Sequence, residues 1–506
     1  MRPGRLGVVG AGTMGAGIAQ LGCAAGIPTV LHDPVTQALD GGIERATSGL
    51  ERWRAKGRVG EEAMSLLTRA VELDGLAGCD LVIEAAPERP DLKRELFAGL
   101  SEVCGDDMVL ATNTSSITVT SLAGAASRPE NVVGMHFFNP PPLMGLLEVI
   151  RADQTGDRAL AVAQATGEAM GKRVILAADG PGFLVNRCGR PFGAEALRLL
   201  QERVATPEQI DRICRLGGGF RMGPFELMDL VGVDVGYEVA LSFTELSFGE
   251  PRWKPSPIQA RMVAAGRLGR KSGHGYYEYA DDGSYREPDL DAPAPGGGAG
   301  RSVLIVGDGA VAAELRELAS AAGFDVSGKG EPDLVVDARR RATGVPDAGG
   351  VPLLLLCAGS SLALRGAPHA AGFHLLPGAA LAELTRTSST PDDVADAAEQ
   401  FVTALGLHRE WVGDAPGLVL GRIVCQLVNE ALFAIGEGVG SEKDVDAGLT
   451  LGLNHPRGPT AWSETIGLDH VATVLDGLWA ERREERYRPA PLLARRAPAT
   501  SVRPRG

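Results

Sequence analysis

The feature that most constrains the fold is a short apolar run that ends in a glycine-rich turn near the start of the chain. Residues 6–9 read as a strand, and Gly10-Ala-Gly12-Thr-Met-Gly15 follows directly and opens a helical stretch that reaches residue 26. A second apolar run, 28–33, ends in an acid. Further runs at 80–86, 108–112 and 131–137 alternate with helical or loop stretches, as βαβ units do. We therefore expect an α/β sheet domain of Rossmann type over residues 1–178.

The glycine turn predicts a dinucleotide site. Three glycines let the backbone approach a pyrophosphate, and the start of the next helix offers unpaired N–H groups and the positive end of its dipole. Asp33 ends the second strand, where a carboxylate accepts bonds from ribose hydroxyls and repels a 2′-phosphate. We expect NAD rather than NADP, held by Gly10, Gly12, Thr13, Met14, Gly15 and Asp33.

The chain then repeats itself. Asp414-Ala-Pro-Gly417 matches Asp179-Gly-Pro-Gly182, and the match continues without a gap at a spacing of 235 residues. Upstream the spacing widens, so the second sheet domain has lost 52 residues between its glycine turn at Gly307 and its serine pair at Ser360. We expect an all-α domain at 179–285, a linker at 286–300, a degenerate sheet domain at 301–413, a second helical domain at 414–484 and a disordered tail at 485–506.

Composition narrows the function classes. The 506 residues need two to four domains, and a net charge of −14 argues against a nucleic-acid binder. No apolar run approaches the length of a membrane span, and the seven cysteines form no CxxC pair. The sequence thus predicts a cytoplasmic protein with no nucleic-acid or membrane partner and no metal site.

A candidate proton-transfer group lies at the end of a predicted strand. His136 ends the run 131–137, and Glu148 follows it by twelve residues on a short strand, where it can receive the imidazole N–H. Asn113-Thr-Ser115-Ser116 ends the preceding strand at the same sheet edge, where open α/β sheets collect ligands. An imidazole held by a carboxylate has a fixed tautomer and suits a proton acceptor near neutral pH.

These motifs together resemble the L-3-hydroxyacyl-CoA dehydrogenase family. The resemblance covers residues 1 to about 280, and the duplicated tail is similar to two-module bacterial members, which act on 3-hydroxybutyryl-CoA or on 3-hydroxyadipyl-CoA in phenylacetate breakdown. It rests on Asn113-Thr-Ser115-Ser116, His136-Phe-Phe-Asn139-Pro140, Glu148, Pro181-Gly-Phe-x-x-Asn186-Arg187, Met222-Gly-Pro-Phe-Glu226, Arg270-Lys271-Ser-Gly and Asn454-His-Pro-Arg-Gly-Pro-x-Ala-Trp462.

The resemblance implies NAD-dependent oxidation of an (S)-3-hydroxyacyl-CoA to a 3-oxoacyl-CoA. His136 would be the general base and Glu148 its orienting acid, while Ser115 and Asn186 would bind substrate oxygens. Contacts to NAD are implied for Glu88, Lys93, Asn139 and Lys271. The segment 35–75 reads as a helical pair, the element that covers CoA in the family, and its candidate phosphate-binding cations are Arg45, Arg52, Arg54 and Lys56.

Two alternatives stay open on sequence. A 3-hydroxyisobutyrate-type dehydrogenase shares the glycine turn and a helical second domain but would need a lysine in place of the His136/Glu148 pair. A catalytically idle relative, like the crystallins that resemble the family, would have lost such groups. In the second module, Asn186 is replaced by Gly421 and the acid after the glycine turn is missing, so one active site per chain is expected. The second helical domain is expected to supply the surface that single-module relatives obtain by dimerising, although a further homodimer remains possible.

Overall fold

The computed structural model describes residues 2–341 and 344–497, and the chain forms two compact units. Unit 1 consists of Met1–Arg187 together with Glu437–Leu453, and unit 2 of Cys188–Gly436 together with Asn454–Gly506. The first unit therefore takes up a short segment from far down the chain, which the domain boundaries expected from the sequence did not include.

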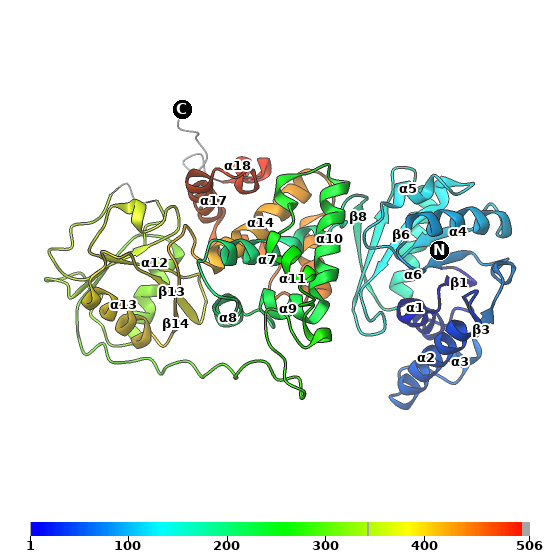
Figure 1. Cartoon of the computed structure of the whole chain (residues 1–506), viewed down its shortest axis with the longest axis horizontal. Coiled ribbons are helices and arrows are strands. Elements are labelled where there is room, and N and C mark those ends of the chain that lie inside the picture. Colours follow the sequence, from blue (N-terminus) through cyan, green and yellow to red (C-terminus); the bar gives the residue numbers. More distant parts are fainter. Residues whose placement is uncertain (1, 342–343, 498–506) are drawn as a thin grey trace. The chain divides into compact units, whose positions relative to one another are not determined.

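The N-terminal part of unit 1, drawn from blue to cyan in Figure 1, contains a sheet with helices packed around it. The sheet has eight strands in the order β3-β2-β1-β4-β5-β6-β7-β8. Neighbouring strands are parallel except β6 and β7, which are antiparallel. The strands are β1 (Leu6–Val9), β2 (Thr29–His32), β3 (Leu67–Ala70), β4 (Leu81–Glu84), β5 (Val109–Thr112), β6 (Val132–Phe137), β7 (Leu146–Arg151) and β8 (Arg173–Ala178). The helices between them are α1 (Thr13–Ala24), α2 (Thr36–Ala55), α3 (Glu62–Ser65), α4 (Pro90–Val103), α5 (Val119–Ala123) and α6 (Asp157–Ala169), with short 3-10 turns η1 (Leu73–Leu76) and η2 (Pro129–Asn131). This confirms the Rossmann-type sheet.

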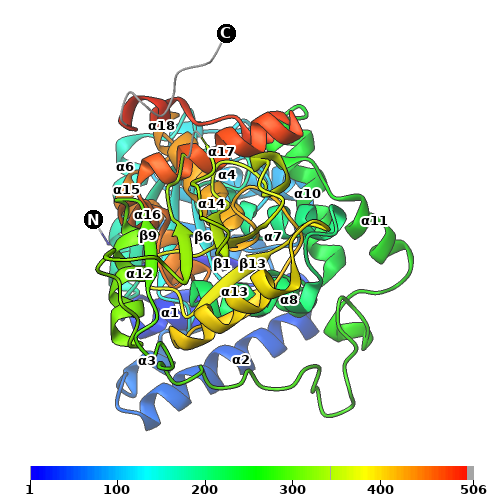
Figure 2. The same ribbon diagram turned by 90° about the vertical axis from the view of Figure 1, so that its left-hand side faces the viewer.

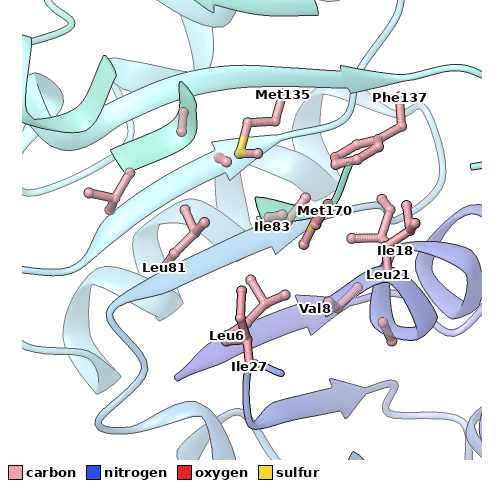
Figure 3. Packing of buried hydrophobic residues seen from close by; sticks show 14 of the residues in the cluster. Leu6, Val8, Ile18, Leu21, Ile27, Leu81, Ile83, Met135, Phe137 and Met170 are labelled. Carbon is pink, nitrogen blue, oxygen red and sulfur yellow. The ribbon is translucent and has the colours of Figure 1, made fainter. Parts of the chain in front are cut away.

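One face of this sheet carries the main apolar core. Alternate residues of the strands point to it, among them Leu6 and Val8 of β1, and helix α1 covers them with Ile18 and Leu21 (Figure 3). These four side chains are at most 2% exposed. Burying an aliphatic side chain of this size contributes about 1.5–3 kcal/mol. This packing holds the glycine turn that joins β1 to α1 against the sheet.

The segment 35–75 is only partly the helical pair that the sequence predicted. Helix α2, the long blue helix in Figure 2, is followed by a single four-residue turn of helix, α3. The chain then adds β3 to the edge of the sheet beside β2. The sequence Leu67-Thr-Arg-Ala70 is too polar to be recognised as a strand. The segment is a strand because its backbone pairs with β2, its one neighbour at the edge of the sheet.

Unit 2 begins within α7 (Val185–Gln201) and continues with α8 (Pro207–Arg212), a π-helical turn η3 (Ile213–Gly217), α9 (Pro224–Val231), α10 (Val233–Leu246) and α11 (Pro257–Ala264), with 3-10 turns η4 (Pro251–Trp253) and η5 (Arg270–Ser272). Residues 286–300 contain neither helix nor strand, as expected of a linker. The segment is nevertheless anchored, because the N–H of Gly296 donates to Ala404 and that of Gly298 to Ala322.

The second sheet has the order β14-β13-β12-β11-β10-β9. It consists of β9 (Val303–Val306), β10 (Leu334–Asp337), β11 (Leu353–Leu356), β12 (Ala370–His374), β13 (Leu381–Thr385) and β14 (His408–Trp411), with α12 (Ala310–Ala321), η6 (Ala363–Arg365) and α13 (Asp392–Ala404). Here β9 pairs directly with β10, whereas β1 in unit 1 lies between β2 and β4. Within the described residues, the deletion has removed the counterparts of α2 and β3, and of β2 it leaves only an isolated parallel bridge between Ser302 and Asp325. In unit 1 the corresponding segment includes Asp33 and the basic helix.

The last elements are α14 (Leu420–Gly436), α15 (Glu442–Gly452), α16 (Pro459–Ile466), α17 (Leu468–Arg482), η7 (Glu485–Tyr487) and α18 (Pro491–Arg496). The expectation of a disordered tail is wrong for residues 485–497, and residues 498–506 lie outside the described part. Tyr487 and Leu493 are fully buried, and α18 packs on α14 and α17. Hydrogen bonds from Asn429 to the carbonyl of Arg488 and from the N–H of Ala490 to Asn429 add to this apolar packing and anchor the arginine- and proline-rich segment.

Equivalent helical segments of the two modules are exchanged, so that each packs on the sheet of the other module. In unit 1, α15 of the second module packs on β7 and β8, and a Cβ on Gly452 would lie 2.9 Å from Leu146. In unit 2, η3 of the first module packs on β13, and a Cβ on Gly217 would lie 3.1 Å from Leu420. Gly217 and Gly452 are themselves equivalent at the spacing of 235. Each module thus completes the sheet domain of the other within one chain.

Candidate active site

His136 and Glu148 face each other across two antiparallel strands. The register of β6 and β7 pairs these two residues, and the imidazole Nδ1 lies 2.9 Å from Oε2 of the carboxylate. Glu148 is fully buried, and its other oxygen accepts the N–H groups of Leu184 and Val185 at 2.9 Å each. Both carboxylate oxygens are therefore fixed, one by the imidazole and one by the start of α7.

This arrangement sets which nitrogen can act. A carboxylate accepts a hydrogen bond, so Nδ1 carries the proton and Nε2 is left with a lone pair. The ring packs beside Phe138, with centroids 4.6 Å apart, and Phe183, at 5.9 Å. The His136 side chain is 8% exposed, which limits the access of water to the imidazole.

Ser115 and Asn186 lie on the two elements that flank this pair. Ser115 follows β5, the neighbour of β6, and Asn113 ties the two strand ends together because its Oδ1 accepts the N–H of Phe137 at 2.8 Å. Asn186 is in the first turn of α7, next to the N–H groups that bind Glu148. Both side chains are partly exposed. The predicted serine, histidine, glutamate and asparagine are thus all carried by unit 1.

The glycine turn has the shape expected for a nucleotide. A Cβ on Gly15 would lie 1.7 Å from the carbonyl oxygen of Gly10, and one on Gly10, where φ is +96°, would lie 2.6 Å from that of Ala85. These two glycines are required by the protein's own packing. Gly12 differs, because no heavy atom lies within 4 Å of its Cβ position. Thr13 is exposed and Met14 partly exposed at the start of α1. The residues present fit a pyrophosphate laid against Gly12 and the N-terminus of α1.

Asp33 and Arg45 both bond to this turn. Oδ2 of Asp33 accepts the N–H of Ala11 and Oδ1 that of Val35, each at 2.9 Å. Arg45 donates to the carbonyl of Ala11 at 2.7 Å. The sequence grouped Arg45 with the CoA-binding cations, and the structure instead places its guanidinium at the glycine turn. Arg52, Arg54 and Lys56 are exposed at the far end of α2, where Arg54 pairs with Glu61.

A buried charge network supports the loops at the ends of β4 and β5. Lys93 is 1% exposed, and its Nζ lies 2.5 Å from Glu84 and 3.3 Å from Glu88. Oε1 of Glu88 accepts Thr114 Oγ1 and the N–H groups of Ser115 and Ser116. Burial acts to raise the pKa of Glu88, but Lys93 and these donors hold it below its ordinary value. The structure thus places Lys93 beneath the surface that Glu88 presents.

Asn139 and Lys271 were also predicted to contact the cofactor. Asn139 is exposed and precedes a cis peptide bond to Pro140. The loop that follows is held by Lys172, whose Nζ donates to the carbonyls of Pro141 and Met144. Burial lowers the pKa of Lys172 to about 8. Lys271 belongs to unit 2, where its Nζ lies 2.6 Å from Asp234, and its contact with a cofactor stays a prediction.

Sequence reasoning missed Glu84, Lys172 and Phe183. A charged residue within a buried strand, as Glu84 is, was the available signal, since such a group needs a partner. Phe183 stands in the motif that carried the resemblance, but nothing in the sequence indicated that its ring would lie beside the histidine.

The second module keeps the equivalent histidine and glutamate, but the two side chains are too far apart for a hydrogen bond. Nδ1 of His374 is 3.9 Å from Glu383, and its Nε2 lies 3.3 Å from His470. His374 is fully buried, and burial, reinforced by His470, lowers its pKa well below the ordinary value. Gly421 stands where the first module has Asn186, and a Cβ there would lie 2.4 Å from the imidazole. His374 is thus a packing residue.

The described residues limit other kinds of site. Nowhere in residues 2–341 and 344–497 do three His, Cys, Asp or Glu side chains gather in a way that could hold a metal ion. Over the same ranges, each helix is too short or too polar to cross a membrane.

The fold and this site define a dinucleotide-dependent oxidoreductase. Comparison with known families gives two matches: "3-hydroxyacyl-CoA dehydrogenase, NAD binding domain" over residues 5–180, and "3-hydroxyacyl-CoA dehydrogenase, C-terminal domain" over 182–279 and again over 417–503. The chain belongs to the 3-hydroxyacyl-CoA dehydrogenase family, and it is an NAD-dependent enzyme. The repeated match to the C-terminal domain agrees with the internal duplication.

Individual relatives agree with this. The chain is 35% identical to the 3-hydroxyadipyl-CoA dehydrogenase of Escherichia coli K12, over 97% of this chain and 96% of that one. It is 41% identical to a probable 3-hydroxybutyryl-CoA dehydrogenase of Deinococcus radiodurans, which matches 54% of this chain over its whole length. The crystal structure of 3-hydroxybutyryl-CoA dehydrogenase from Escherichia coli K12 superposes with a TM-score of 0.84 at 33% identity, covering 98% of each chain. The alternative of a 3-hydroxyisobutyrate-type dehydrogenase therefore does not hold.

Proposed function

We propose that this enzyme oxidises (S)-3-hydroxyacyl-CoA to 3-oxoacyl-CoA at a single site in unit 1, with His136 as general base. The observation that carries the proposal is the imidazole held at 2.9 Å by a carboxylate that is itself anchored by two backbone N–H groups. NAD supplies the acceptor for the hydride that leaves C3 of the substrate. The chain's own task is to remove the proton from the 3-hydroxyl and to fix the geometry.

His136 takes that proton on Nε2, the nitrogen left with a lone pair. The ring becomes a cation as the proton arrives, and the Glu148 carboxylate stabilises that cation because the two groups are already in contact in a buried setting. Ser115 and Asn186 hydrogen-bond the substrate oxygens and hold the carbon that loses hydride in a reactive pose. Correct placement by fixed groups accounts for much of the rate in reactions of this kind.

The cofactor is held by the glycine turn and by polar groups around it. Gly10, Gly12, Thr13, Met14 and Gly15 provide the pyrophosphate site, and Asp33 accepts bonds from the ribose hydroxyls. Glu88, Asn139 and Lys271 bond other parts of NAD, while Lys93 acts through Glu88, since its ammonium is enclosed by carboxylates. Arg52, Arg54 and Lys56 are the cations for CoA phosphates, and Arg45 adds positive charge beside the glycine turn.

The substrate class is an acyl-CoA, as the names of the relatives indicate: one acts on 3-hydroxyadipyl-CoA and others on 3-hydroxybutyryl-CoA. A single chain supplies both modules of the paired arrangement, because α15 of the second module packs on the first sheet and η3 of the first module packs on the second sheet. The seven cysteines are all buried and none of them forms a disulfide, which suits a reducing compartment such as the cytoplasm.

Absorbance of NADH formed from NAD and 3-hydroxybutyryl-CoA or longer esters tests the reaction. His136→Ala should lower turnover by about two to four orders of magnitude. His374→Ala is the matched control, since it removes the equivalent imidazole of the second module, and turnover should be retained. Equal loss from both changes would refute the single site, and no NADH with any acyl-CoA would refute the proposed function.

A further inference from the structure

Unit 2 contains a cavity of about 570 Å³ that is lined by none of the residues assigned to the proposed reaction. It lies among α7, α9, α10 and α11, and its wall mixes apolar side chains such as Leu197, Met228 and Leu241 with four cations. The cations are Arg190, Arg198, Lys254 and Arg486. A cavity with an apolar wall and a few cations suits an anion that carries an apolar stem.

Arg190 is the unusual member of this group. Within residues 2–341 and 344–497, its Nε is buried with no hydrogen-bond partner, and no neighbouring carboxylate acts to raise its pKa. Its guanidinium carbon lies 4.6 Å from the centre of the Phe243 ring. Burial lowers the pKa of Arg190 to about 10, so the side chain still carries its charge at neutral pH. The residue as a whole is partly buried, and a partly desolvated charge without an acid partner is costly to the protein alone.

The acids around the cavity are already engaged. Glu484 pairs with both Arg198 and Arg486. Further along α7, Glu195 binds Arg422 and Tyr487. Glu430 is paired with Arg252 at 2.9 Å. The lining of the cavity itself includes no Asp or Glu, so no lining carboxylate neutralises Arg190.

The equivalent helix of the second module packs without an arginine at this position. Helix α14 repeats α7 at the spacing of 235 residues, and it has Cys425 where α7 has Arg190. Cys425 is fully buried among apolar groups. The same helix can thus be packed with a small apolar residue at this position, which indicates that the cation serves a purpose of the first module.

We propose that this cavity binds an aliphatic carboxylate, with Arg190 as the group that receives the anion and the apolar wall as the site for its stem. An arginine fork and a carboxylate form two parallel hydrogen bonds, a geometry that other monovalent anions do not match as well. The carboxylate has two sources: a free fatty or dicarboxylic acid, or the distal end of a dicarboxylic acyl-CoA substrate. The second source rests on the proposed function, and the first does not.

Titration calorimetry with hexanoate, and with uncharged hexanamide as the matched probe, tests the cavity on the full chain. Hexanoate should bind and hexanamide should not. Arg190→Met, which keeps the length of the side chain and removes the charge, should weaken hexanoate binding by roughly ten- to a hundredfold. Arg190→Lys should retain part of the affinity. Arg261→Met is the control, because it removes one positive charge, as Arg190→Met does, from an exposed arginine of α11 that does not line the cavity. Its affinity for hexanoate should equal that of the parent protein.

Rates distinguish the two sources of the carboxylate. The esters 3-hydroxyadipyl-CoA and 3-hydroxyhexanoyl-CoA have the same chain length and differ in the distal carboxylate. A loss of kcat/KM in Arg190→Met that is confined to the adipyl ester assigns the cavity to the substrate. Loss of hexanoate binding with unchanged rates on both esters assigns it to a free acid. If no NADH is formed from either ester, the proposed function fails while calorimetry still tests the cavity.

The thermal midpoint excludes a purely structural arginine. Removing a partly buried charge that has no acid partner should leave the melting temperature of Arg190→Met unchanged or raised, and hexanoate should no longer raise it further. If Arg190→Met and the parent protein bind hexanoate equally and show the same preference between the two esters, the proposal is overturned. A melting temperature that falls in Arg190→Met, with hexanoate affinity unchanged, also overturns it.

Discussion

Replacing Glu148 by glutamine changes one oxygen into an NH₂ group and leaves the shape of the side chain intact. In the native protein this carboxylate accepts three hydrogen bonds, from the imidazole of His136 and from the N–H groups of Leu184 and Val185. A glutamine has only one oxygen with which to accept them. Its amide must therefore choose between the two backbone donors and the imidazole.

The energetics favour the backbone. Turning the amide NH₂ toward Leu184 and Val185 would leave two buried donors unsatisfied, at about 1–3 kcal/mol each. Keeping the amide oxygen there presents NH₂ to the imidazole, so Nδ1 becomes the acceptor and the proton moves to Nε2. Restoring the active tautomer then costs about 3–5 kcal/mol, counted as the lost bond and the unsatisfied groups. At about 1.4 kcal/mol per tenfold, kcat should fall by roughly two to four orders of magnitude.

The assay is the steady-state rate of NADH formation, with the melting temperature recorded alongside. Because the two backbone bonds survive, Glu148→Gln should melt close to the parent protein. Glu383→Gln is the matched control: Glu383 also accepts two backbone N–H groups, from Val419 and Leu420. Each oxygen of Glu383 accepts one of these N–H groups, and burial raises the pKa of the carboxyl to about 8, so it is largely protonated and uncharged at neutral pH. A Glu148→Gln enzyme that retains nearly full kcat, or a Glu383→Gln enzyme that loses as much, would refute the reasoning.

Three further changes have direct outcomes. Asp33→Ala should raise KM for NAD more than KM for NADP, because the acceptor for the ribose hydroxyls and the repulsion of the 2′-phosphate are lost together. An unchanged ratio of the two KM values would count against the proposed role of Asp33 in binding the ribose. Lys93→Met should lower the free energy of unfolding by about 3–5 kcal/mol in urea, because it leaves the carboxylate of Glu84 buried without its cation; unchanged stability would contradict the pairing. His455 is buried beside Phe192 and Phe220, and burial lowers its pKa to about 4. The free energy that the neutral ring contributes to folding is therefore fully present above the unfolded pKa near 6.5 and is lost as the pH falls toward 4. In His455→Phe the melting temperature should depend less on pH across this window, and an identical pH dependence would show that the histidine is not buried as a neutral ring.

Local patterns were sufficient for much of the fold. The strand at 6–9 and the turn from Gly10 to Gly15 were predicted where the structure has them, because a strand, a glycine turn and a helix follow from contacts between near neighbours. The edge strand β3 was missed because its stability comes from pairing with β2, which no local pattern of apolar residues reports. The helix after residue 490 was missed for a related reason, since Leu493 is buried by α14 and α17, which are contributed by other parts of the chain.

The candidate site divides in the same way. The sequence alone determined that this chain has a strand-turn-helix for a dinucleotide, one complete serine, histidine, glutamate and asparagine set, and a second module that has lost Asp33 and Asn186. Only the tertiary structure decided that Glu148 is anchored by the start of α7, that Lys93 lies beneath Glu88, and that, among the described residues, the buried Nε of Arg190 finds no hydrogen-bond partner. The reason is physical: residue types and spacings are written along the chain, whereas burial and pairing depend on which distant segments pack together.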